Sequence, residues 1–147
     1  MATLYGLNYD ETYNENGKYR PGEYNGHVKT LYDEHTFVED VNAIGDDILI
    51  GKLPAGARVL ATRVKSDSMG TTGIFELGYQ ANGVDVADTD AFDASIDAGG
   101  AAVQSDGDGV AIGKKFSAET IVQLQLTEAT DSAIGDTVKV WVHYIVD

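Results

Sequence analysis

The sequence predicts an all-β fold: an antiparallel two-sheet sandwich, jelly-roll-like, preceded by an extended N-terminal arm and carrying one short helix. From Thr36 onward, short runs rich in β-branched and aromatic residues recur between turns that bear Gly and Asp. In the last third of the chain, apolar and polar residues alternate with the period of a strand. A chain of 147 residues suits one domain. We therefore divide it into an arm, residues 1–35, and a β-sandwich domain, residues 36–147.

The arm is rich in tyrosine and has no sustained apolar period. Residues 1–35 hold most of the chain's tyrosines and several Asn-Gly or Pro-Gly turns, which favours an extended segment. Aromatic rings without a core of their own need a surface, either on the same domain or on a neighbouring subunit. The sequence leaves both alternatives open. The candidate partner contacts in the arm are Tyr5, Tyr9, Tyr13, Tyr19 and Tyr24.

Four runs in the first half of the domain predict strands: "TFVEDV", "DILIGKL", "ARVLATRVK" and "GIFELGYQ". Asn82-Gly83 predicts a two-residue hairpin turn after the fourth run. The segment "DTDAFDASI" predicts the short helix, Asp88 to Ile96, because its acids lie where the helix dipole favours them. With the later runs, the count reaches eight or nine strands.

The last two strands show the clearest alternation. Val122, Leu124 and Leu126 alternate with Gln123 and Gln125, and Val138, Val140 and Val142 alternate with polar or aromatic residues. We expect these valines and leucines in the core and the two glutamines in solvent. The second face of the last strand is also partly apolar, so Trp141 and Ile145 are predicted to meet another element or another chain.

Charge excludes one class of partner. The formal net charge is −14, the isoelectric point is near 4.3, and no Lys or Arg lies between Lys65 and Lys114. Such a chain repels nucleic acid. No apolar run is long enough to span a bilayer, and the first residues do not resemble a signal peptide, so no membrane partner is expected. The acidity indicates either simple solubility or a surface that faces solvent on an assembly.

Groups that could support chemistry are sparse. The chain has no cysteine, its three histidines are far apart in sequence, and it has no phosphate-binding glycine loop or nucleophile motif. Asp106 and Asp108 resemble a fragment of a calcium loop, but the remaining ligands are missing. We therefore assign no catalytic, cofactor-binding or metal-binding residue, and the protein is predicted not to be an enzyme and to need no cofactor.

The order of turns and strands from Leu53 to Ala101 resembles small virion structural proteins of tailed bacteriophages. The matching features are an "LPAGA" turn leading into a strand, a "GTTG" turn, a strand ending in "LG" and an acidic "DTDAF" segment. The resemblance implies a capsid decoration (cement) protein that binds the major capsid protein on the outer capsid surface. It also implies a homo-oligomer made in the host cytoplasm and located in the virion. Two alternatives remain: another virion part, such as a head fibre or tail protein, and a carbohydrate-binding β-sandwich module.

Overall fold

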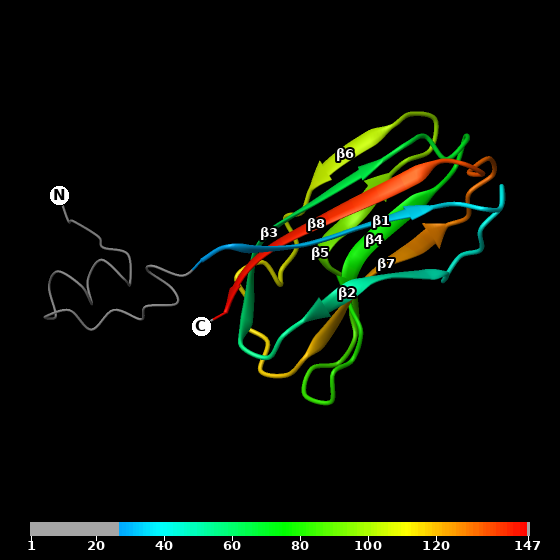
Figure 1. The fold of residues 1–147 in the computed structure, drawn as a ribbon. Coiled ribbons are helices and arrows are strands. Elements are labelled where there is room, and N and C mark those ends of the chain that lie inside the picture. The colour runs from blue at the N-terminus through cyan, green and yellow to red at the C-terminus, as the bar shows by residue number, and fades with distance from the viewer. Residues whose placement is uncertain (1–26, 147) are drawn as a thin grey trace, which may run out of the picture.

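The computed structural model describes residues 27–146, which form eight strands in two sheets (Figure 1). The strands are β1 (Lys29–Thr36), β2 (Asp47–Leu53), β3 (Ala57–Ser66), β4 (Ile74–Tyr79), β5 (Asp88–Asp97), β6 (Val103–Asp106), β7 (Thr120–Glu128) and β8 (Thr137–Val146). The predicted antiparallel two-sheet sandwich is confirmed. Residues 1–26, which hold most of the predicted arm, lie outside the described residues.

The first sheet has the strand order β1-β8-β3-β6, and the second has the order β2-β7-β4-β5. All strand pairs are antiparallel. Only the connection between β4 and β5 stays within one sheet; each other connection crosses to the opposite sheet.

The loops therefore gather at two ends of the sandwich (Figure 1). The start of β1, the end of β8 and the loops 54–56, 80–87 and 107–119 form one end, which we call the terminal end. The loops 37–46, 67–73, 98–102 and 129–136 form the other, which we call the distal end.

The core lies between the sheets, where the inward-facing residues of both meet. Its largest fully buried side chains include Phe75, Phe92, Phe116, Leu53, Met69 and Leu77. The six residues predicted as core from alternation, Val122, Leu124, Leu126, Val138, Val140 and Val142, are all buried. The period-two pattern therefore gave the correct inner faces of β7 and β8.

The predicted helix, Asp88 to Ile96, is wrong, because these residues form strand β5. Its backbone finds partners on both sides: β4 on one, and the amides of Gly109 and Ala111, which donate to the carbonyls of Phe92 and Ala91, on the other. Gly78 permits the close approach of β4, since a Cβ there would lie 2.0 Å from the Asp88 carbonyl oxygen. Non-local pairing thus overrides the local helical signal.

Three finer expectations also differ from the structure. The strand predicted at "TFVEDV" lies earlier, at β1, and Phe37 begins a loop although its ring is buried. Gln123 is 3% exposed rather than solvated, because it lies in a central strand beside Leu49 of β2. The Asn82-Gly83 turn lies within a longer connection, residues 80–87, in which the Asn82 amide donates to the Asp85 carbonyl.

The sandwich also begins earlier in the chain than the expected boundary at residue 36. Residues 29–36 pair along their whole length with β8, so the end of the segment assigned to the arm belongs to the sandwich.

Candidate interaction surfaces

The outer face of the first sheet carries an unusual set of side chains. Because Val138, Val140 and Val142 point inward, the alternate residues of β8 point away from the core, together with their cross-strand partners. One row across the sheet is Tyr32, Trp141, Arg63 and Asp106, and the next is Glu34, Lys139, Lys65 and Gln104. We call these two rows, with His143, the aromatic–cationic face.

Two aromatic rings form its centre. Tyr32 and Trp141 lie directly opposite each other in the register, with ring centroids 5.2 Å apart and the planes tilted by 40°. Tyr32 is 47% exposed, and its hydroxyl donates to a Glu34 carboxylate oxygen at 2.8 Å. This hydrogen bond raises the pKa of Tyr32 above its usual value. Trp141, predicted as a partner contact, is half-buried, and Tyr32 of β1 packs against its ring.

Three cations lie beside these rings. Arg63 donates through two nitrogens to the Asp106 carboxylate, which lowers the pKa of Asp106. Lys139 lies 3.8 Å from Glu34, and Lys65 lies directly opposite Lys139 in the register. Like charges at directly opposite positions of an antiparallel pair destabilise the sheet. The pKa of Asp67 is lowered first by its hydrogen bonds to Thr137 and then by the charges of these two lysines, so this carboxylate offsets part of their repulsion.

An open hollow adjoins the rings and the cations. Its volume is about 420 Å³, and it is lined by Arg63, Lys65, Gln104, Trp141 and His143. The His143 ring is oriented by Thr30, whose hydroxyl lies 3.0 Å from Nδ1. The hollow therefore offers an aromatic edge and several polar donors to the same ligand.

The other predicted contacts fall elsewhere. Ile145 is only 5% exposed, so its side chain offers almost no surface to a partner. Tyr5, Tyr9, Tyr13, Tyr19 and Tyr24 lie outside the described residues.

Sequence reasoning did not include Tyr32 among the candidate contacts, and it missed the cluster of cations. The alternation of Arg63 and Lys65 already indicated a shared face, but only the strand register brings Lys139 beside them.

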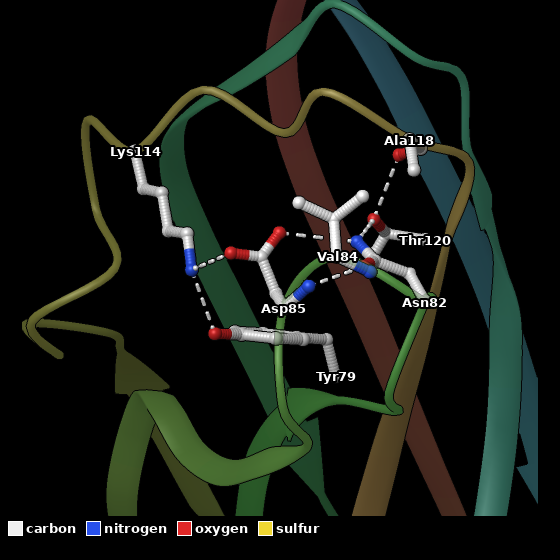
Figure 2. Close-up of polar contacts among 7 residues, drawn as sticks. All are labelled: Tyr79, Asn82, Val84, Asp85, Lys114, Ala118 and Thr120. Carbon is white, nitrogen blue, oxygen red and sulfur yellow. Dashed lines mark hydrogen bonds and ion pairs between the residues drawn. The ribbon is translucent and has the colours of Figure 1, made fainter.

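A second polar cluster ties together two loops at the terminal end (Figure 2). Lys114 reaches from the loop 107–119 to the Asp85 carboxylate and to the Tyr79 hydroxyl, each at 2.9 Å. The Asn82 side chain donates to Asp85 and, at 2.8 Å, to the Thr120 hydroxyl. The loop 80–87 is thus fixed against β7 and against its neighbouring loop.

The charges of this cluster support each other. The Lys114 ammonium and the Asn82 amide lower the pKa of Asp85, while the hydrogen bond to Tyr79 and the Asp85 carboxylate raise the pKa of Lys114. Lys114 also lies over the ring of Tyr79, 4.9 Å from its centroid. Every group has a partner in the fold, which indicates a structural clamp rather than a site awaiting a ligand.

Exposed apolar side chains gather at the distal end. Val38, Val41 and Ile44 project from the loop 37–46, and Ile134 projects from the loop 129–136. The two loops run side by side, since Asp40 accepts hydrogen bonds from the amides of Ala133 and Ile134. We call these four residues the distal rim. Grouped exposed apolar residues of this kind are typical of contact surfaces.

Within residues 27–146, no group of three or more potential ligand side chains could hold a metal ion, and no helix could cross a membrane. Asp106, part of the calcium-like fragment, is paired with Arg63 instead.

Comparisons with solved structures show two chains of similar fold. One belongs to the capsid of Ralstonia phage GP4, with a TM-score of 0.67 and 18% identity over 83% of this chain and 86% of that chain. Another belongs to the capsid asymmetric unit of cyanophage Pam1, with a TM-score of 0.62 and 15% identity over 100% of this chain and 92% of that chain. At these identities the likeness is one of fold. No protein-family model and no curated protein matches the sequence.

Proposed function

We propose that this protein is a non-enzymatic virion structural protein that decorates a phage capsid by binding the outer surface of the major capsid protein lattice. The observation that carries the proposal is the extent of the fold likeness. Both neighbours are chains of phage capsids, and the match spans most of this chain and most of each neighbour. The likeness therefore extends over most of both chains and is not limited to one part of a longer neighbour.

The strand order supports the same proposal. Two facing sheets with the orders β1-β8-β3-β6 and β2-β7-β4-β5 correspond to an eight-stranded jelly roll. Jelly rolls are common among viral capsid domains. The resemblance of the segment from Leu53 to Ala101 to small virion proteins of tailed phages rests on different observations and leads to the same class.

The mechanism of such a protein is added interface area. A shell under internal pressure fails at the seams between subunits, and a small rigid domain across a seam contributes binding free energy that is lost when the seam opens. Weak contacts suffice, because many copies, associated as homo-oligomers, bind one lattice. The distal rim is the contact that we favour, because Val38, Val41, Ile44 and Ile134 are exposed together on loops that hydrogen bond to each other.

Placement on the outer surface agrees with the net charge of −14, since a strongly acidic protein is repelled by the packaged genome. On this proposal the chain is made in the host cytoplasm and then becomes part of the virion.

The test is reconstitution. Capsids that lack this protein are mixed with increasing amounts of it, and the bound copies are counted and located by electron microscopy. We expect saturable binding at regular lattice positions and greater resistance of the particles to heat. Density confined to the tail or to a head fibre would assign the protein to another virion part. Failure to bind capsids together with binding to a glycan array would favour the carbohydrate-binding alternative.

A further inference from the structure

The aromatic–cationic face gathers three cations on one surface of a strongly acidic protein. Arg63, Lys65 and Lys139 lie on adjacent strands and on one surface, although the chain has a formal net charge of −14. Arg63 and Lys139 have carboxylate partners on the same face, and Asp67, directly after β3, lines a small hollow together with Lys65 and Lys139. Lys65 and Lys139 still lie directly opposite each other, so a further carboxylate placed between them would relieve the repulsion of the two ammonium groups.

The rings beside these cations add a second requirement. Tyr32 and Trp141 expose an aromatic surface next to the lysines, and the hollow of about 420 Å³ extends it. A ligand suited to this face therefore carries carboxylates and rings or other apolar groups close together.

The chain itself contains such a ligand. Residues 1–17 hold Asp10, Glu11 and Glu15, interspersed with Tyr5, Tyr9 and Tyr13, and contain no Lys or Arg. Both the carboxylates and the rings that the face requires are thus present in one short stretch.

We propose that residues 1–17 dock on the aromatic–cationic face of the same molecule, with carboxylates of Asp10 and Glu11 at Lys65 and Lys139. The connection is long enough. The described chain begins at His27, next to the edge strand β1, and the face extends from β1 across β8 to β3. Lys139 lies opposite Glu34, so the path runs roughly 23 Å along β1 and two strand spacings, roughly 10 Å, across the sheet. The residues between Glu15 and His27 span up to roughly 40 Å when extended, which is enough. Attachment to the same chain gives the segment a high effective concentration at the face.

Disulfide trapping tests this docking directly, because the chain has no cysteine of its own. One full-length variant carries Thr12→Cys with Gln104→Cys, an exposed β6 position on the face. Its matched control carries Thr12→Cys with Leu49→Cys, which is exposed on the outer surface of the second sheet. Under mild oxidation we expect the first pair to close within one chain at least about tenfold faster than the control. Equal rates would overturn the proposal, and a disulfide-linked dimer would place the segment of a second copy on the face and overturn docking within one molecule.

Charge reversal separates electrostatic docking from chance encounter. In the Thr12→Cys, Gln104→Cys background, Lys65→Glu with Lys139→Glu should slow closure to the control rate, and adding Asp10→Lys with Glu11→Lys should restore it. Circular dichroism and the fluorescence of Trp141, the single tryptophan, verify that each variant is folded. Closure that is unchanged by the lysine reversals would contradict the role of the cations. The experiment uses isolated protein without capsids, so its failure leaves the proposed decoration untouched.

Discussion

The loops 37–46 and 80–87 both expose apolar side chains, but they are attached to the sandwich in different ways. The first is held by backbone hydrogen bonds: Phe37 exchanges bonds with Asp136 and Gly135, and the Asn42 carbonyl accepts from the amide of Thr130. Beyond Gln80, the second is held to the rest of the fold by side chains, chiefly Asp85 and Asn82.

This difference in attachment shows which loop can detach from the sandwich without unfolding the domain. Backbone bonds of the first loop continue the pairing of the sheets, so they are lost only when the distal end opens. The second depends on one ion pair and a few polar side chains, so a single substitution or a change of pH should free it.

The largest effect is expected from the base of the first loop. Phe37 is buried, and the centroid of its ring lies 4.9 Å from that of His35 and 6.2 Å from that of Phe75. Phe37→Ala should lower the free energy of unfolding by about 3 kcal/mol, because it leaves a cavity in the core. Urea denaturation measures the change, with exposed Val38→Ala as the control. A loss no larger than that of the control would show that this loop is not coupled to the core.

A smaller and more local effect is expected at the clamp of the second loop. Lys114→Met keeps the aliphatic stem but removes the ion pair with Asp85 and the hydrogen bond to Tyr79. We expect the domain to lose about 1 kcal/mol. Hydrogen exchange should accelerate in residues 81–87 and stay unchanged in residues 37–46.

The matched control is Lys52→Met, which removes an exposed ion pair with Glu119. It should change stability by less than about 0.5 kcal/mol. Faster exchange in both loops of the Lys114→Met protein would refute their independence.

The same clamp predicts a pH window. The pKa of Asp85 is lowered in the folded protein, so its contribution is present above the ordinary aspartate range and is lost as the pH falls through the lowered value. The pKa of Lys114 is raised, so its contribution is lost only as the pH rises through that higher value. The clamp is therefore complete between about pH 4 and pH 10.

Methyl resonances of Val84 and Val86 should shift as the pH is lowered below about 4, while those of Val38 and Val41 stay constant. Two carboxylates at the distal end also have a lowered pKa: Asp131 accepts a hydrogen bond from the amide of Thr71, and Asp67 accepts one from the amide of Thr137. Their protonation therefore acts on the loop 67–73 and on the start of β8. Equal shifts in both pairs of valines would contradict the proposed difference.

Local patterns in the sequence predicted the sandwich well, and long-range pairing accounts for the errors. The alternation in β7 and β8 gave their inner faces, since a period of two depends only on the strand itself. It could not show that Asp88 to Ile96 would find backbone partners in β4 and in the loop after β6. Likewise, Lys65 and Lys139 are far apart in sequence, and only the register of β3 with β8 brings them together. The clamp at Lys114 has no sequence signal, because its partners come from separate loops and strands.

The last prediction compares the distal rim with the loop 80–87 as the surface that contacts the capsid. It rests on the proposed decoration. A loop held by backbone bonds loses less conformational freedom on binding than one held by side chains, so the distal rim should bind better per exposed apolar group. Val41→Ser with Ile134→Ser should weaken capsid binding about tenfold, equivalent to about 1.4 kcal/mol. Val84→Ser with Val86→Ser should change it less than about twofold. All four side chains are exposed, so stability should change by no more than about 0.5 kcal/mol in either variant.

Binding of each variant to capsids, measured over a concentration series, distinguishes the two surfaces. A stronger loss of binding in the Val84→Ser, Val86→Ser variant would show that the terminal end contacts the capsid.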